Sequence, residues 1–257
     1  MNNPRNIKLI IQFDGTDYCG WLYQKHCKTV QETISESLRK LTGNATEIIG
    51  CSRTDRGVHA VEYVLNFNDF SSIPIDKYPL ALNSFLPDDI ICKKAELMPA
   101  DFHATYSVTK KTYRYYFYTS QRAVPFFNNS AWFLGSDYIF TDEMLAALND
   151  DIKALCGKHD FSAFRSVGGM SKTTVRTIFD INVTKSHFFS SEIFCLEVTG
   201  DGFLYNMVRI ITGTVADIIK GRIKSDSIKN ILDSCDRKNA GPTAPPQGLY
   251  LWSVDYS

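Results

Sequence analysis

Hydrophobic and polar residues alternate along six stretches of this chain. Alternation with a period of two is typical of β-strands, because successive side chains of a strand point to opposite faces. The pattern predicts strands at residues 7–13, 61–67, 113–117, 179–183, 194–198 and 250–256. Apolar residues at helical spacing predict helices at 30–41, 142–155 and 208–218, and a shorter helix is expected between 225 and 235.

Two of these helices have signals at their first residues. Thr29 and Glu32 are spaced as in a capping box, in which the threonine hydroxyl accepts a hydrogen bond from an amide of the first turn. Gly43 follows the last apolar position, where a glycine commonly ends a helix. Thr141 is placed to cap the second helix in the same way. Both helices therefore have a predicted first residue.

Strands and helices follow one another in a similar mixed order in both parts of the chain. This order favours an α+β fold with a largely antiparallel sheet over a doubly wound parallel sheet. We expect two similar mixed α/β halves, ferredoxin-like or RRM-like, at residues 1–105 and 106–257. We expect them to join into one largely antiparallel sheet flanked by helices, with an active-site cleft between them.

Positive and negative charges balance in this chain. Its 257 residues include 28 Lys and Arg and 28 Asp and Glu, so the formal net charge is zero. A polybasic protein that captures nucleic acid through its bulk charge is excluded. Two local stretches are nevertheless basic, 102–122 without any acidic residue and 157–179 with Asp160 alone. They could line a groove and contact phosphates, or be scattered over solvated faces.

Targeting signals, disulfides and cofactor motifs are not expected. No apolar run approaches the length that spans a bilayer, and the first residues lack the apolar stretch of a signal peptide. The cysteines number seven and form no Cys-x-x-Cys pair, which predicts buried, unpaired thiols in a reducing, cytoplasmic setting rather than disulfides or a zinc site. Because neither G-x-G-x-x-G nor a Walker motif occurs, no nucleotide cofactor is expected.

The segment Gly50–Ala60 is a polar, charge-dense loop that precedes a predicted strand. It contains Asp55 between Arg53 and Arg56. A nearby arginine favours the ionised form of an aspartate. An ionised carboxylate can act as a nucleophile or as a base. On residue types alone, however, a solvated turn with a surface ion pair is the more frequent outcome.

The order of residues in this loop, Gly50-x-x-Arg53-Thr54-Asp55-x-Gly57-Val58-His59-Ala60, resembles the signature of the tRNA pseudouridine synthase A (TruA) family. Further stretches match that family in order along nearly the whole chain. They lie at residues 13–21, 29–31, 83–90, 102–104, 111–115, 157–164, 202–209, 240–245 and 248–251. Chance agreement at this many sites is negligible.

The resemblance implies an RNA-modifying isomerase. Members of this family convert uridine to pseudouridine without cofactor or metal, here expected in the anticodon stem-loop of tRNA (positions 38 to 40). Asp55 matches the catalytic aspartate, which either attacks the nucleoside or abstracts a sugar proton. Tyr113 matches the tyrosine that stacks on the target uracil and is a candidate to take the C5 proton. Arg209 matches the arginine that pairs with that aspartate.

The resemblance also implies substrate contacts and a partner subunit. Arg53 matches an arginine that helps displace the target base from the RNA stem, and Leu249 matches a leucine under the uracil ring. Phe203 is expected to pack beside the base, and Arg56 to contact a phosphate or face solvent. The expected partners are tRNA and a second copy of the chain, with no DNA and no membrane.

Several residues depart from the family pattern. Ser52 stands where the family usually has Gly, Arg56 where it has Ala, Thr105 where it has Arg, and Leu22 where it has Gln. None replaces a matched catalytic residue, but Ser52, Arg56 and Thr105 leave the RNA target open, and the intact set of Asp55, Tyr113 and Arg209 argues for catalysis. Two alternatives are therefore kept. One is a relative that modifies another RNA, such as ribosomal RNA; the other is an RNA-binding or RNA-folding protein with little catalysis.

Three histidines lie in matched motifs, at positions 59, 103 and 159. Their spacing is not that of metal ligands. We therefore expect them to make structural hydrogen bonds.

Overall fold

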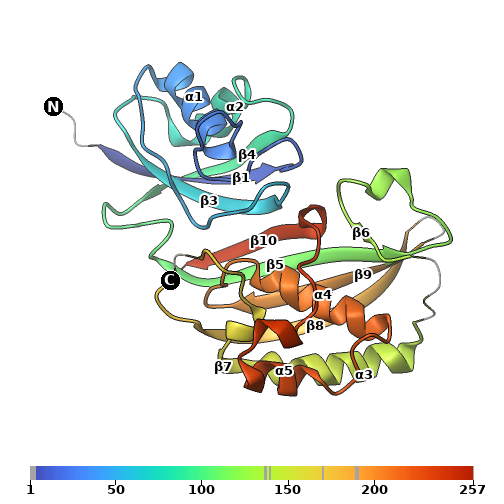
Figure 1. The fold of residues 1–257 in the computed structure, drawn as a ribbon. Coiled ribbons are helices and arrows are strands. Elements are labelled where there is room, and N and C mark those ends of the chain that lie inside the picture. The colour runs from blue at the N-terminus through green and yellow to red at the C-terminus, as the bar shows by residue number, and fades with distance from the viewer. Residues whose placement is uncertain (1–3, 136–137, 139, 170, 189–190, 257) are drawn as a thin grey trace. The chain divides into compact units, whose positions relative to one another are not determined.

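The structure is a computed structural model, and it describes residues 4–135, 138, 140–169, 171–188 and 191–256. The chain divides into two compact units (Figure 1). The first is Met1–Thr109 with Tyr250–Ser257, and the second is Lys110–Leu249. The terminal strand thus groups with the first unit, whereas the sequence analysis placed it in the C-terminal half. Each unit combines helices with a mainly antiparallel sheet, which confirms the α+β class.

The first unit contains a sheet with the strand order β4-β1-β3-β10. Its strands are β1 (Arg5–Phe13), β2 (Ile49–Gly50), β3 (His59–Asp69), β4 (Ile90–Met98) and β10 (Leu249–Tyr256). β1 runs antiparallel to β3 and β4, β2 pairs antiparallel with β3, and β10 runs parallel to β3. Helices α1 (Val30–Thr42) and α2 (Tyr78–Asn83) pack against each other on one side of this sheet (Figure 1).

The core of the first unit follows the predicted periodicities. The alternate residues Ile7, Leu9 and Ile11 of β1 are fully buried, and α1 buries its apolar stripe. Burying one such side chain contributes roughly 1.5–3 kcal/mol relative to leaving it exposed. The α1 boundaries are confirmed as well, because the Thr29 hydroxyl accepts from the Glu32 amide and Gly43 ends the helix with φ +75°.

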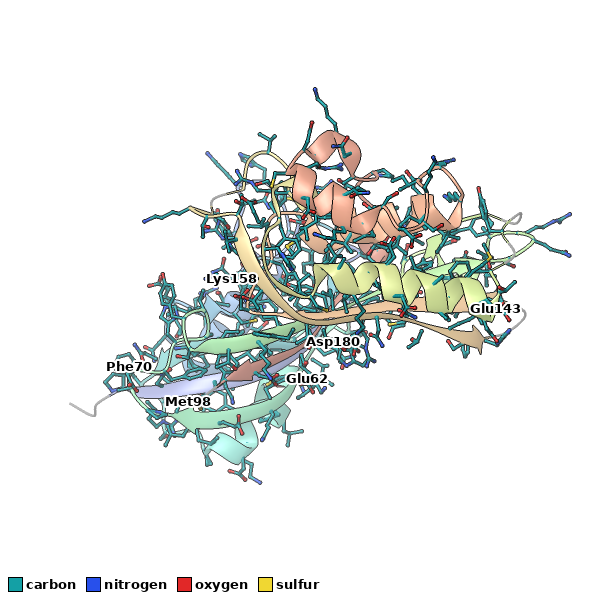
Figure 2. All side chains as sticks on the ribbon, turned by 90° about the horizontal axis from the view of Figure 1, so that it is seen from below. Glu62, Phe70, Met98, Glu143, Lys158 and Asp180 are labelled. Atoms are coloured by element: carbon teal, nitrogen blue, oxygen red, sulfur yellow. A yellow bond between two sulfur atoms is a disulfide. The ribbon has the colours of Figure 1, made fainter. Side chains whose placement is uncertain are left out.

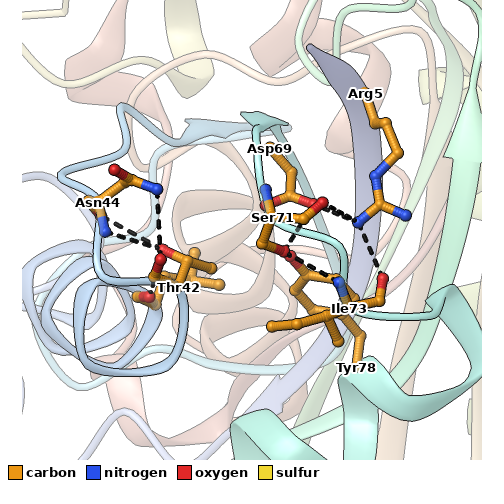
Figure 3. Close-up of polar contacts among 8 residues, drawn as sticks. Arg5, Thr42, Asn44, Asp69, Ser71, Ile73 and Tyr78 are labelled. Atoms are coloured by element: carbon orange, nitrogen blue, oxygen red, sulfur yellow. Dashed lines mark hydrogen bonds and ion pairs between the residues drawn. The ribbon is translucent and has the colours of Figure 1, made fainter. Parts of the chain in front are cut away.

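Polar contacts join the first residue of β1 to the last residue of β3 (Figure 3). The Arg5 guanidinium pairs with the Asp69 carboxylate and donates to the backbone carbonyls of Ser71 and Ile73, at 3.0 and 2.8 Å. Burial raises the pKa of Asp69, but hydrogen bonds from the Ser71 amide and from Arg5 outweigh it, so the pKa lies below its usual value. Burial also raises the pKa of the adjacent Tyr78 to about 12.

The second unit contains a sheet with the strand order β5-β9-β8-β7. Its strands are β5 (Val108–Thr119), β6 (Trp132–Phe133), β7 (Gly157–Asp160), β8 (Val175–Phe188) and β9 (Ser191–Gly200). The four sheet strands are antiparallel to their neighbours, and the short β6 runs parallel to β5. Three helices, α3 (Asp142–Ile152), α4 (Met207–Ile219) and α5 (Ile228–Ser234), gather on one side of these strands (Figure 1).

The predicted strands and long helices are present, with ends shifted by a few residues. As expected, the Thr141 hydroxyl caps α3, accepting from the Met144 amide. The sequence pattern did not predict β4, the short strands β2, β6 and β7, or helix α2. β4 lies at the edge of the first sheet, and polar or exposed residues such as Lys93 and Lys94 interrupt its alternation. An edge strand lacks the strict pattern of a strand that buries one face.

Candidate active site

Asp55 lies in the loop 51–58, which joins β2 to β3 in the first unit. Its side chain is half-buried, while Arg53 and Arg56 on either side are exposed. The Val58 amide donates to the Asp55 carbonyl at 3.2 Å, and Gly57 has φ +76°. A positive φ costs glycine little, so this glycine allows the chain to turn immediately after Arg56.

The segment 18–28, which we call the hairpin because it doubles back through the isolated bridge of Gln24 and Cys27, supports this loop through backbone atoms. The Trp21 amide donates to the Thr54 carbonyl at 3.0 Å, and the Gly57 amide donates to the Tyr18 carbonyl at 3.3 Å. Gly20 has φ +96°, and a Cβ atom there would lie 2.4 Å from the Thr54 oxygen. Any larger residue at position 20 would therefore displace the loop that carries Asp55.

Two of the positions that depart from the family pattern contribute to this support. The Ser52 carbonyl accepts a hydrogen bond from the Tyr63 hydroxyl, so the main chain at this position helps to hold the loop. The Tyr63 ring stacks on Trp21 with 4.1 Å between ring centroids. Thr105 donates through its hydroxyl to the Gly50 carbonyl at 2.7 Å. Thr105 therefore has a structural role at the last residue of β2, directly before the loop.

In the second unit, Tyr113 lies on β5 opposite Val198 of β9 and is buried. The Phe203 ring meets the Tyr113 ring edge to face, with 5.1 Å between centroids and an interplanar angle of 83°. Such a T-shaped contact fixes the plane of both rings. The structure therefore brings these two predicted site residues together.

Arg209 lies in the first turn of α4, and its half-buried guanidinium is held in two directions. Its Nε donates to the Ala244 carbonyl at 2.7 Å, and one terminal nitrogen donates to the Asn206 side-chain oxygen at 2.8 Å. Asn206 occupies the N-cap position of α4 with φ +61°, without a side-chain capping bond, and donates through its side-chain amide to the Ser166 hydroxyl at 3.0 Å. These bonds set the direction in which the arginine charge points.

The segment 240–245 packs directly on α4. A Cβ atom on Gly213 would lie 1.7 Å from the Pro242 carbonyl oxygen, and one on Gly241 would lie 2.6 Å from the Thr214 Cα. The Tyr115 hydroxyl donates to the Pro245 carbonyl at 2.6 Å. Leu249 is buried and begins β10 directly after this region. Glycine at both contact points therefore brings the acceptor carbonyl of Ala244 to Arg209.

The predicted site residues fall into two groups. Arg53, Asp55 and Arg56 share the loop of the first unit. In the second unit, Tyr113 contacts Phe203, and Arg209 contacts the segment that precedes Leu249. The sequence analysis missed Asn206, although it lies inside a matched stretch, because only its positive φ and its bonds to Arg209 and Ser166 reveal its role.

The expectation that all cysteines are unpaired is wrong. Cys19 and Cys27 form a disulfide, and their Cα atoms are 6.1 Å apart. The hairpin brings them together, because the Cys19 amide donates to the Lys28 carbonyl at 2.9 Å. Of the other cysteines, Cys51 and Cys92 are buried. Neighbouring positions on a hairpin cannot be deduced from cysteine spacing alone.

The three histidines make the predicted structural contacts. His59 accepts at Nδ1 from the Gly15 amide at 3.1 Å and stacks on Tyr250. His103 accepts from two amides of its own turn, and His159 lies 2.8 Å from the Cys156 carbonyl. Among the described residues, no group of three or more His, Cys, Asp or Glu is arranged to hold a metal ion.

The two basic stretches are only partly available for an anionic ligand. Arg114 pairs with Glu197 on the neighbouring strand, and Arg176 donates to backbone carbonyls of its own segment. Lys158 on β7 is exposed (Figure 2). Lys110 on β5 is exposed as well. In the part of the chain that the structure describes, no helix has the length and apolar character that crossing a membrane requires.

Comparison with known families shows to which class of protein this chain belongs. The family model described as "tRNA pseudouridine synthase" matches residues 9–107 and 152–257, which include the loop of Asp55 and the segment of Arg209. By sequence, the chain thus falls in the class of pseudouridine synthases.

Relatives that match over their full length show to which family within this class the chain belongs. A protein of Acetivibrio thermocellus named "tRNA pseudouridine synthase A" is 46% identical over 98% of this chain and 100% of its own length. One of Thermoanaerobacter sp. with the same name is 43% identical over the same shares. One of Clostridium tetani, named "tRNA pseudouridine synthase A 2", is 43% identical over 98% of this chain and 99% of its own length. The chain belongs to the tRNA pseudouridine synthase A family.

Proposed function

We propose that this protein isomerises uridine to pseudouridine in the anticodon stem-loop of tRNA, on the 3′ side of the stem. The observation that carries the proposal is the match to a named relative over 98% of the chain, together with the family match at residues 9–107 and 152–257, which includes the loop of Asp55. The matched residues Tyr113 and Arg209 support it, because each is held in a defined orientation within its unit.

The reaction is an isomerisation and balances without a co-reactant. The bond between N1 of uracil and C1′ of ribose breaks, the base turns, and a bond from C5 to C1′ forms. The proton on C5 leaves, and N1 gains one. We assign Asp55 to attack on the nucleoside or to abstraction of a sugar proton, and Tyr113 to stacking on the base and accepting the C5 proton. Arg209 supplies the positive charge that the family pairs with its aspartate.

Substrate contacts follow from the same assignment. Arg53 and Arg56 are exposed on the loop beside Asp55, where they can reach RNA. Cations in this position neutralise phosphates and make affinity dependent on salt. Leu249 and Phe203 supply apolar surface for the base, since extruded bases are commonly held by stacking and apolar contacts. We also propose that the protein acts in the cytoplasm and forms a homodimer. Light scattering of the purified protein tests the dimer.

The decisive experiment compares the wild type with Asp55→Asn and with Asp101→Asn, a matched control at an exposed position. Each protein is incubated with unmodified tRNA and with ribosomal RNA, and pseudouridine is mapped by chemical labelling and sequencing. We expect product in the tRNA anticodon stem-loop with the wild type and the control, and a loss of about 10⁴-fold or more with Asp55→Asn, typical of removing a reacting group.

Two other results would redirect the assignment. Product only in ribosomal RNA would overturn the tRNA assignment while keeping the reaction. RNA binding without any Asp55-dependent product would leave an RNA-binding or RNA-folding protein.

A further inference from the structure

The disulfide of Cys19 and Cys27 lies in the hairpin that supports the Asp55 loop. Their Cα separation of 6.1 Å is within the range that a disulfide can bridge. Two hydrogen bonds keep this geometry, from the Cys19 amide to the Lys28 carbonyl at 2.9 Å and from the Gln24 side chain to the Cys19 carbonyl at 2.8 Å. Both cysteines are half-buried, so small reagents can reach them.

A positive charge lies next to this pair. One terminal nitrogen of Arg56 is 2.8 Å from the Cys19 sulfur and 3.6 Å from the Cys27 sulfur. A guanidinium beside a cysteine favours the thiolate, which is the form that attacks a disulfide. The shorter distance assigns Cys19 as the attacking thiol and Cys27 as the resolving one.

The pair is also coupled to the loop of Asp55. Arg56 follows Asp55 directly, and the hairpin residues Gly20 and Trp21 touch the loop backbone at Thr54. The Arg56 side chain therefore contacts the sulfur pair while belonging to the loop that we assign to RNA binding. In compartments that keep thiols reduced, disulfides are usually transient and redox-sensing.

We propose that Cys19 and Cys27 are a redox-reversible dithiol whose state sets how much of the Arg56 charge is available to RNA; the RNA part rests on the proposed function. The oxidant is a low-molecular-weight disulfide. The Cys19 thiolate attacks one of its sulfurs, which breaks that S–S bond and releases a thiolate that takes up a proton. Cys27 loses its proton and attacks the Cys19 sulfur, which releases the second small thiol. The two cysteines lose two electrons, and one small disulfide becomes two thiols.

The consequence for RNA follows from charge balance. In the dithiol form the Cys19 thiolate offsets the Arg56 guanidinium. Oxidation consumes that thiolate and leaves a neutral sulfur beside the guanidinium, so more of the Arg56 charge is available to neutralise a phosphate. One additional neutralised phosphate steepens the dependence of log affinity on log salt by about 0.7–0.9.

Thiol chemistry is tested on the reduced full-length protein with oxidised glutathione, by intact mass and peptide mapping after alkylation. We expect a cross-link between Cys19 and Cys27 that dithiothreitol reverses. Cys27→Ser should trap glutathione on Cys19, and Arg56→Met should slow the reaction about threefold, because a smaller thiolate fraction is partly offset by higher nucleophilicity. Cys235→Ser, at an exposed free cysteine, is the control and should form the cross-link normally. Failure of the wild type to cross-link, or an unchanged rate in Arg56→Met, overturns the assignment.

The RNA part is tested by equilibrium binding of unmodified tRNA over a range of salt concentrations, which needs no catalysis. The oxidised wild type should have the steeper salt dependence, while the two forms of Arg56→Met should coincide. Equal slopes for the two wild-type forms overturn the coupling to RNA. If neither form binds tRNA, the proposed function fails, while the cross-linking result stands on its own.

Discussion

The two groups of candidate site residues, one in each unit, are held in different ways. In the first unit, the Asp55 loop is held through main-chain atoms, with carbonyls of Thr54 and Ser52 accepting from Trp21 and Tyr63. In the second unit, the side chain of Arg209 itself is held by hydrogen bonds to the Asn206 side chain and to the Ala244 carbonyl. A main-chain contact does not depend on which side chain is present, so the bond from Tyr63 to the Ser52 carbonyl is compatible with the departure from the family pattern at position 52. A side chain that makes the hydrogen bonds itself cannot be replaced without losing them.

The largest effect is expected where α4 meets the segment 240–245. Gly213→Val would place a Cβ atom 1.7 Å from the Pro242 oxygen, so helix and segment must separate. We expect a loss of about 3 kcal/mol or more in the free energy of unfolding, as for severe overpacking. Urea denaturation followed by circular dichroism measures it.

The matched control for that substitution is Gly221→Ala. Gly221 has φ +67° but open space around it, so only the backbone preference is lost, at about 1 kcal/mol. Equal losses in the two variants would show that the close approach at Gly213 contributes nothing.

The next effect should separate catalysis from stability in the first unit. Gly20→Ala would place a Cβ atom 2.4 Å from the Thr54 oxygen and 3.1 Å from the Asp55 carbonyl carbon. Because a displacement of about 1 Å in a catalytic group costs about 100-fold in rate, we expect kcat to fall by about that factor. Single-turnover pseudouridine formation measures it. Gly43→Ala, with φ +75° and nothing nearby, should leave kcat unchanged; a normal kcat in Gly20→Ala would contradict a rigidly held loop.

A smaller effect should show what the hydrogen bonds of the Arg209 side chain contribute to catalysis. Arg209→Lys keeps the positive charge but cannot reproduce both bonds, to Ala244 and to Asn206. We expect kcat to fall about tenfold, which corresponds to one charge-assisted hydrogen bond. Parallel measurement of tRNA affinity should show little change. A variant as active as the wild type would mean that charge alone suffices.

The same contrast explains what the sequence could predict. The caps of Thr29 and Thr141 and the fold class follow from local patterns, because a helix end or an alternating strand is encoded within a few residues. The positions of Asp55 and Arg209 depend on backbone contacts between distant segments, so only the family resemblance indicated them. The pairing of Cys19 with Cys27 required the hairpin register, which no short pattern specifies.

The smallest effect concerns the opposite end of β3 from the Asp55 loop. Folding lowers the pKa of Asp69, so its carboxylate stabilises the protein above the unfolded pKa of about 3.9, and this contribution is lost as the pH falls through the lower folded value. Asp69→Asn should cost about 1 kcal/mol at pH 7, a modest loss because Arg5 is 30% exposed and keeps two carbonyl acceptors.

Denaturation of the wild type and Asp69→Asn at several pH values tests this assignment, since the difference between them cancels the other carboxylates. The difference should be full at pH 7 and should shrink below about pH 4. The kcat of Asp69→Asn at pH 7 should equal that of the wild type, because Asp69 is at the far end of the strand that begins after the Asp55 loop. A pH-independent difference would mean that packing, not the carboxylate charge, stabilises this end of the sheet.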